Sequence, residues 1–381
     1  KRPPPSSAPA APAAPLPPVS HRSHGTRAGD IFVFGTGDCG QFGRGEDVVE
    51  ASRPILSPLP SEEAVAVDAP PLPPALKRRA LQVAPGGMHT LALADDGSVW
   101  STGVNDEGAL GRPTAGEVWD GKQEEEEEEE EEKMEEDNAD GDDKEEKPAP
   151  AKKAKTSSST FDSAPHLPRG DPYSWGAVSF PEGAGPFVQV SAGDSHSCAL
   201  AADGRLWAWG TYRDASGVFG FGVGVRIARS PECVYAAPKQ TAATSRVVKV
   251  ASGADHTLAL TANGEVLSWG TAGAGALGRV GERLPPRRSA LEELVLKPAK
   301  VKFPGGKSNA PRIEDIFAGT YSSFAIAGEG KMVFGWGLNN YGQLSVGNGG
   351  AAAVWSPVRL AALEEAAEKG GRSRVRKEEV V

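Results

Sequence analysis

Short runs of alternating apolar and small or polar residues recur along the chain, and each pair of runs encloses a glycine turn. The runs at 258–260 and 266–269 show this alternation, and Asn263-Gly264 lies between them. Alternation with a period of two predicts β-strands, and an Asn-Gly or Asp-Gly pair predicts a tight hairpin turn. The pattern therefore predicts a series of small antiparallel sheets.

These hairpins repeat at a fixed spacing. In four copies a lead glycine is followed eleven residues later by a turn glycine, and a fifth, partial copy spans 29–43. The lead glycines are Gly86, Gly193, Gly253 and Gly319. One small sheet cannot bury both of its faces, so repetition at about sixty residues predicts an all-β fold, a β-propeller with about five recognisable units.

Composition divides the chain into segments. We expect a disordered Pro/Ala-rich tail over 1–28, a first part of the propeller over 29–112 and a second part over 174–363. We expect an unfolded acidic insertion over 113–173 and a charged tail over 364–381. The expected tails and insertion rest on proline content and on runs of like charge, which disfavour a packed core. Ala51 to Lys77 is also Pro-rich and is expected to be a loop, and a long loop with Arg283, Arg287 and Arg288 is expected after the copy led by Gly253.

The net charge of −10 is unevenly distributed. Residues 124–146 contain seventeen acidic residues and two lysines, so this segment carries 2 − 17 = −15 and the remainder carries −10 + 15 = +5. A lysine cluster follows, at Lys147, Lys152, Lys153 and Lys155. Such a cluster can serve as a nuclear import signal read by an import receptor, or it can simply balance the acidic run.

Other compositional features restrict the function classes. Cys39, Cys198 and Cys233 are far apart, which fits a reducing compartment and disfavours disulfides or a zinc site. No apolar run approaches the roughly 18 residues that span a bilayer, so we expect no membrane partner. There is no phosphate-loop motif and no catalytic constellation, so we expect neither an enzyme nor a cofactor.

His89, His196 and His256 occupy one repeated position and invite a metal hypothesis. Equivalent positions lie in different sheets and do not converge as metal ligands would. We therefore interpret them as structural histidines, each bonding its own turn, and expect no metal site.

Two sets of residues remain for function. Tyr212 to Phe219 has no counterpart in the other copies, so function is expected to concentrate there. Five polar residues flank strands at bends, where each alone could merely cap a turn; together they would form an anionic ring with one arginine, suited to a protein partner with basic groups. They are Asp38, Asp194, Asp255, Arg279 and Asn340.

Several motifs make the chain resemble the regulator of chromosome condensation family, the chromatin-bound nucleotide exchange factors of the GTPase Ran. They are SHRSH at 20–24, GDCGQFG at 37–43, NDEGALGR at 105–112, RDASGVFG at 213–220 and GLNNYGQL at 337–344. The resemblance implies a seven-bladed propeller in the nucleus, with one face for Ran and a protruding β-wedge that loosens the bound nucleotide.

The resemblance also assigns residues. It implies that Asp38, Asp194, Asp255, Arg279 and Asn340 serve Ran binding or exchange. The wedge maps to Tyr212, Arg213, Asp214, Ala215, Ser216, Gly217, Val218 and Phe219. Contacts to nucleosomes, histones and DNA would come from His21, Arg22, His24, Arg287 and Arg288.

The chain departs from the family pattern in three respects. About two of seven repeats are missing, so we expect a truncated chain, an incomplete ring and an exposed sheet edge. A functional histidine of the sixth repeat has no position here, and two usually amide-bearing wedge positions are Ala215 and Ser216. The alternative function is a non-catalytic propeller adaptor for protein or chromatin binding that uses the same repeats, and an enzyme acting on a small molecule is disfavoured because no acid/base pair converges.

Overall fold

The computed structural model describes residues 27–60, 78–114, 170–328, 332–346 and 352–361. All the strands and helices named below belong to one compact unit of the chain, within 1–112 and 171–381.

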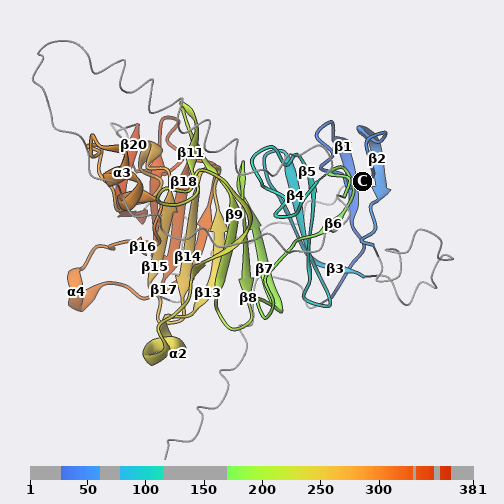
Figure 1. The fold of residues 1–381 in the computed structure, drawn as a ribbon. Helices are drawn as coiled ribbons and strands as arrows, with labels where there is room; N and C mark the ends of the chain where they lie inside the picture. Colours follow the sequence, from blue (N-terminus) through green and yellow to red (C-terminus); the bar gives the residue numbers. More distant parts are fainter. Residues whose placement is uncertain (1–26, 61–77, 115–169, 329–331, 347–351, 362–381) are drawn as a thin grey trace, which may run out of the picture. The chain divides into compact units, whose positions relative to one another are not determined.

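Four four-stranded antiparallel sheets account for most of the strands (Figure 1). In each sheet the strands pair in sequence order, so each sheet is a simple meander. The first contains β3 (Ala80–Pro85), β4 (His89–Ala94), β5 (Val99–Gly103) and β6 (Gly176–Ala177). The second contains β7 (Phe187–Ala192), β8 (His196–Ala201), β9 (Leu206–Gly210) and β12 (Ala228–Tyr235).

The third and fourth sheets repeat this plan. The third contains β13 (Val247–Ser252), β14 (His256–Thr261), β15 (Val266–Gly270) and β16 (Ala299–Lys300). The fourth contains β17 (Ile313–Ala318), β18 (Ser322–Ala327), β19 (Met332–Leu338) and β20 (Ala353–Arg359). Two further pairs stand apart from these sheets, β1 (Phe32–Thr36) with β2 (Glu50–Leu56) and β10 (Tyr212–Asp214) with β11 (Gly217–Gly220).

The predicted hairpin turns are confirmed between the second and third strands. Gly97, Gly204 and Gly264 have φ of 81°, 89° and 83°, a left-handed conformation that glycine adopts without strain. Two segments differ from expectation. The Pro-rich segment 51–77, expected to be a loop, contains most of β2, and the long loop expected after the copy led by Gly253 contains the helix α3 (Arg288–Val295).

The remaining helical elements are single turns in connections. They are η3 (Lys239–Thr241), α2 (Ala242–Ser245), η4 (Gly273–Gly275) and α4 (Gly306–Asn309).

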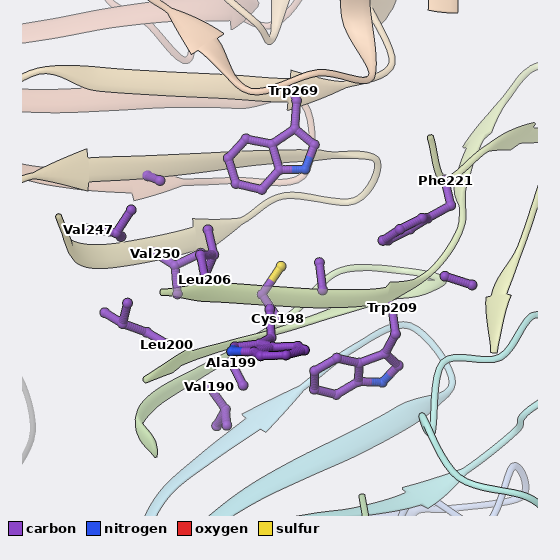
Figure 2. Close-up of a cluster of buried hydrophobic side chains, with 14 of the residues drawn as sticks. Val190, Cys198, Ala199, Leu200, Leu206, Trp209, Phe221, Val247, Val250 and Trp269 are labelled. Atoms are coloured by element: carbon purple, nitrogen blue, oxygen red, sulfur yellow. The ribbon is translucent and has the colours of Figure 1, made fainter. Parts of the chain in front are cut away.

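The sheets pack face to face in sequence order. All six residues of β4, β8 and β14 are buried, which requires cover on both faces of these strands. A central cluster contains Cys198, Trp209 and Trp269, which Figure 2 shows among its buried side chains. Full burial of a large apolar side chain such as leucine or phenylalanine contributes about 1.5–3 kcal/mol. Packing between sheets is therefore the main source of stability.

Among the described residues, one face of the fourth sheet is only partly covered. In β18 burial alternates, with Ala325 and Ala327 fully buried and Phe324 and Ile326 partly exposed. On β1, at the start of the described chain, Phe34 is 69% exposed. These apolar faces confirm the prediction of an incomplete ring for the described residues.

The repeated histidines join neighbouring sheets. Nε2 of His89 is 2.8 Å from Ser197 Oγ in the next sheet, and Nε2 of His256 is 2.9 Å from Ser323 Oγ. Ser197 donates its own proton to Ala109 O, so it must accept from His89. The interpretation as structural histidines holds in this form, but these bonds run to the next sheet instead of to the histidine's own turn.

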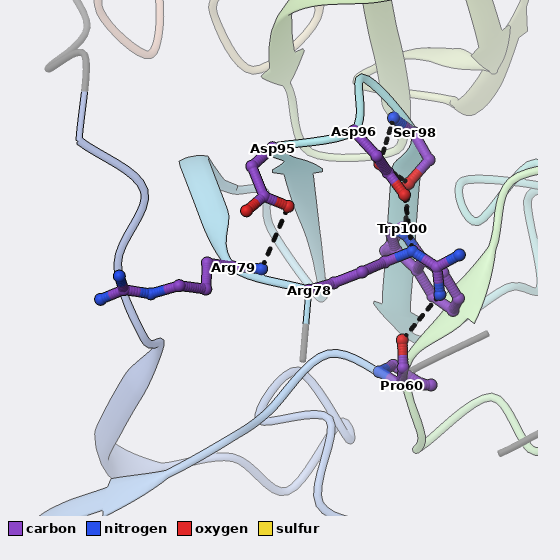
Figure 3. A network of polar contacts seen from close by, with 7 residues as sticks. All are labelled: Pro60, Arg78, Arg79, Asp95, Asp96, Ser98 and Trp100. Atoms are coloured by element: carbon purple, nitrogen blue, oxygen red, sulfur yellow. Dashed lines mark hydrogen bonds and ion pairs between the residues drawn. The ribbon is translucent and has the colours of Figure 1, made fainter. Parts of the chain in front are cut away.

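A polar network holds the end of the first sheet at which β4 turns into β5 (Figure 3). The Arg78 guanidinium pairs with Asp96 at 2.6 Å, donates to Pro60 O at 2.8 Å and lies 5.0 Å from the Trp100 ring centroid. Asp96 in turn accepts from Ser98 N at 2.8 Å. This network ties the segment after β2 to the β4–β5 turn.

Candidate functional site

The loops that join first to second strands and third to fourth strands lie at one end of each sheet, because the strands form antiparallel meanders. Hydrogen bonds join these loops from sheet to sheet: Gly87 N donates to Gly193 O at 3.1 Å, and Asp194 N donates to Ala254 O at 2.9 Å. The loop between β1 and β2 joins the same end, since Thr102 Oγ1 donates to Gly40 O at 2.9 Å. All five polar residues predicted from the sequence lie in these loops.

The hairpin β10–β11 rises from the same end, between β9 and β12, and belongs to no four-stranded sheet. Its tip, Asp214 to Ser216, is exposed, and the turn is closed by Ser216 N, which donates to Asp214 Oδ1 at 2.8 Å. Its base is buried, with Tyr212 fully inaccessible and Phe219 only 8% exposed. The segment unique to this copy is therefore a projection with an anchored base.

Asp255 holds the first strand of this hairpin. Its Oδ1 accepts a hydrogen bond from Arg213 N at 2.7 Å, and the Arg213 side chain pairs with Glu107 from the loop after β5. The pKa of Asp255 is raised to about 6, mainly by burial and in smaller part by the nearby charges of Asp194 and Glu107; the bond from Arg213 N–H and the Arg213 charge oppose this rise. Three acidic residues thus surround the base of the hairpin.

A small cavity of about 90 Å³ adjoins this cluster, lined by Glu107, Asp194, Ser195 and Arg213 among others. Asp194 itself is exposed. The structure therefore brings together Asp194, Asp255 and the base of the hairpin. The cavity is too small for a nucleotide, so this cluster suits contact with a macromolecular surface.

The other predicted residues lie in separate loops. Asp38 is exposed in the β1–β2 loop, and Asn340 is exposed in the β19–β20 loop, where its Oδ1 accepts from Gln343 Nε2 at 3.3 Å. Both remain at the same end of their sheets. Among the described residues, neither Asp38 nor Asn340 forms a recorded hydrogen bond with the hairpin.

Arg279 differs from the expected ring of surface charges. Its Nε donates to Ser268 O at 3.1 Å, and its terminal nitrogens donate to the carbonyls of Leu294, Val295 and Lys297. Burial lowers the pKa of this guanidinium to about 10. Arg279 therefore contacts main-chain acceptors of its own sheet and the C-terminal end of α3.

Arg288 lies beside the hairpin, although the resemblance assigned it to chromatin. Its Nη2 donates to Phe219 O at 2.8 Å, and its Nε pairs with Glu292 at 3.0 Å. Arg287 is exposed at the start of α3. His21, Arg22, His24, Lys147, Lys152, Lys153 and Lys155 lie outside the described residues.

Two site residues were missed from the sequence. Glu107 belongs to the NDEGALGR motif, which was singled out without a role for its glutamate. Glu292 lies on α3 in a segment expected to be a loop. A signal for the helix was present, because Leu291 and Val295 are four residues apart.

The described residues contain neither a cluster of metal-binding side chains nor a helix that could cross a membrane. They contain no group of three or more His, Cys, Asp or Glu side chains placed to bind a metal ion. No helix within them has the length and apolar character needed to cross a membrane.

Comparisons with known proteins agree on one family. The family described as RCC1-like domain matches residues 30–375. The regulator of chromosome condensation of Homo sapiens is 34% identical over 347 residues, covering 91% of this chain and 63% of the relative. The guanine nucleotide exchange factor SRM1 of Saccharomyces cerevisiae is 32% identical over 339 residues, covering 87% of this chain and 58% of the relative.

Solved structures give the same result. The structure of Prp20p from Saccharomyces cerevisiae, described together with its binding to Gsp1p and histones, has 27% identity and a TM-score of 0.59, covering 88% of this chain and 60% of that one. Yeast RCC1 (Prp20) bound to Kap60 has 26% identity and a TM-score of 0.60, covering 93% and 63%. The chain thus spans between 58% and 63% of the matched chain in each of these four comparisons.

Proposed function

Because the chain belongs to the family of the RCC1-like domain, we propose that it is a guanine nucleotide exchange factor for the small nuclear GTPase Ran. The observation that carries this proposal is the hairpin β10–β11, whose exposed tip projects from a buried base at the loop end of the sheets. The yeast relative SRM1 is named a guanine nucleotide exchange factor, which supports the same proposal.

Exchange requires no covalent step. A surface that binds the empty GTPase more tightly than the loaded form weakens nucleotide affinity by the same factor, through thermodynamic linkage. The acidic cluster around Asp194 and Asp255 supplies a face for basic groups of the GTPase, and the tip at Asp214 to Ser216 supplies the wedge. The protein then acts as a regulator of a GTPase.

The test is release of fluorescent GDP from Ran by the purified full chain. Asp214→Ala removes the tip carboxylate that closes the wedge turn, and we expect it to slow release by about tenfold, the equivalent of one lost charge-assisted hydrogen bond. Asp203→Ala is the matched control, because Asp203 is an exposed carboxylate that closes a turn at the opposite end of the sheets.

The alternative function is a propeller adaptor without exchange activity. Ala215 and Ser216 at the tip favour it, since their short side chains make a smaller projection than amide-bearing residues would. A folded chain that binds Ran yet leaves GDP release at the spontaneous rate would support the adaptor and rule out the exchange factor.

Chromatin is the second partner that we propose, and the nucleus is the proposed location. Prp20p is described as binding histones. Of the two arginines assigned to chromatin, Arg287 is the better candidate, because the Arg288 guanidinium is bound to the hairpin and to Glu292. In a gel-shift titration, binding to nucleosomes should therefore weaken more for Arg287→Ala than for Arg288→Ala. Equal losses of binding would contradict this ranking.

The lysine cluster is the proposed import signal. Yeast RCC1 (Prp20) was solved bound to Kap60, which is consistent with recognition of a basic segment. A fluorescent fusion in which Lys147, Lys152, Lys153 and Lys155 are changed to Ala should lose nuclear accumulation. Unchanged accumulation would mean that the lysines only balance the acidic run.

A further inference from the structure

The wedge hairpin is too short to hold its own position. Its strands have 3 and 4 residues, and the register shifts between Tyr212 and Arg213. A single two-stranded hairpin is marginally stable in water at best. Its direction must therefore come from groups outside the hairpin.

The first strand is held by loops of two different sheets. Asp255, from the third sheet, accepts from Arg213 N, and Glu107, from the first sheet, pairs with the Arg213 side chain. The Glu107 side chain is only 17% exposed. An ion pair with one partner this well buried is less screened by salt than a surface pair.

The second strand is held by α3. Arg288 Nη2 donates to Phe219 O at 2.8 Å, and the guanidinium lies 5.8 Å from the Phe219 ring centroid. Glu292 joins α3 to the loop after β11. One of its carboxylate oxygens accepts from Arg288 Nε at 3.0 Å, and the other accepts from Gly224 N at 3.2 Å. The Glu292 side chain is only 13% exposed.

The helix α3 is itself fixed to the third sheet. Its end residues Val295 and Leu296 are buried in the central core cluster. Arg279 binds the carbonyls of Leu294, Val295 and Lys297, which the end of a helix leaves without intrahelical donors. A continuous series of contacts therefore leads from the core through α3 to the wedge.

We propose that α3 is a brace that sets the position of the wedge, with Arg288 and Glu292 as its positioning residues and Arg279 as its anchor. This inference rests on the proposed function in so far as the wedge acts on Ran. It assigns Arg279 an indirect role: the residue holds the helix that holds the hairpin. It also assigns Arg288 to the exchange machinery in place of chromatin.

The brace is tested by hydrogen exchange of the full chain without any partner. Glu292→Ala should raise the exchange rate of the β11 and Gly224 amides by about tenfold, as expected when a bond to a charged group is lost. The amides of β8 should keep their protection, which reports that the core stays folded. Glu293→Ala is the matched control, because Glu293 pairs with Lys297 at 2.5 Å, and no interaction with the hairpin is recorded for it in the described chain.

A second pair of variants guards against a merely destabilised helix. Arg288→Ala removes the donor to Phe219 O, whereas Arg288→Lys keeps a donor and a positive charge. We expect Arg288→Ala to loosen β11 as Glu292→Ala does and Arg288→Lys to restore most of the protection. Equal loosening by both would overturn the brace, and so would unchanged β11 protection in Glu292→Ala and Arg288→Ala.

Exchange kinetics separate this inference from the proposed function. In GDP release from Ran, Glu292→Ala should lower kcat by about tenfold and leave KM nearly unchanged, because the binding face is intact and only the wedge is displaced. Faster hydrogen exchange in β11 with unaltered GDP release would leave the brace standing and overturn the action of the wedge on the nucleotide. Slower hydrogen exchange or no change in β11 would overturn the brace itself.

Discussion

Asp255 is a carboxylate whose ionisation opposes folding. It is only 8% exposed, and burial raises its pKa from 3.8 to about 6. Because Asp255 Oδ1 accepts from Arg213 N at the base of the wedge, the charge lies where the hairpin leaves the sheets. Asp255→Asn removes this charge and keeps an oxygen that can accept the same bond.

The sign of the effect follows from proton binding. A raised pKa means that the folded state holds the proton more tightly than the unfolded state does. Between about pH 4 and pH 6 the free energy of unfolding therefore falls as pH rises, and above about pH 6 it stays lower. A shift of about two pKa units corresponds to about 3 kcal/mol. Because an amide oxygen accepts more weakly than a carboxylate, we expect Asp255→Asn to gain about 1–2 kcal/mol at pH 8.

Urea unfolding of the two proteins at pH 8 and pH 5 measures this difference. The gain should fall by about 1.4 kcal/mol at pH 5, where most of the folded wild type carries the proton. Groups unchanged by the substitution cancel in the comparison, and Asp203→Asn controls for the altered net charge. An Asp255→Asn variant that is no more stable than the wild type at pH 8, or whose gain is the same at both pH values, would refute this reasoning.

Three other consequences can be measured. Burial lowers the pKa of His256 to about 4, so stability should fall by about 1.4 kcal/mol per pH unit per such histidine between pH 6.5 and 4, and His256→Gln should reduce the slope of urea-derived free energies by one proton. Burial raises the pKa of the Cys198 thiol to about 12, so a thiol reagent should label exposed Cys233 in the native protein and Cys198 only after unfolding, as followed by mass spectrometry. Gly210→Ala would place a Cβ against Ser195 O at φ 89° and should cost several kcal/mol in thermal unfolding, whereas Gly217→Ala has φ 112° in open space and should cost about 1 kcal/mol.

The strands were predictable because their signals are local. Alternation at 258–260 and 266–269 and the turn at Gly264 correspond to β14, β15 and a positive φ. The strand β2 was missed because its pairing with β1 outweighs its proline content. The histidine bonds could not be foreseen in detail, since each partner lies between 61 and 108 residues away.

The candidate site was predictable in its location and not in its contacts. Placing all five polar residues in loops at one end requires only the meander pattern, and this follows from the spacing. The pairing of Glu107 with Arg213 joins residues 106 apart in sequence, and no local pattern reports such a pair. The helix α3 was overlooked because its polar segment was read with the long connection around it.

The two repeated arginines show how the scaffold supports the projection. Arg112 and Arg279 both end an Ala-Leu-Gly-Arg sequence, and both donate to a serine of their own sheet, Ser101 or Ser268. Their other acceptors differ. Arg112 binds the carbonyls of the segment that leads into β6, whereas Arg279 binds the end of α3. One repeated contact thus secures an ordinary connection in the first sheet and the helix beside the wedge in the third. A residue that recurs in several repeats can therefore affect function through an element that only one repeat contains. For this reason, position in the repeat alone could not distinguish the two arginines.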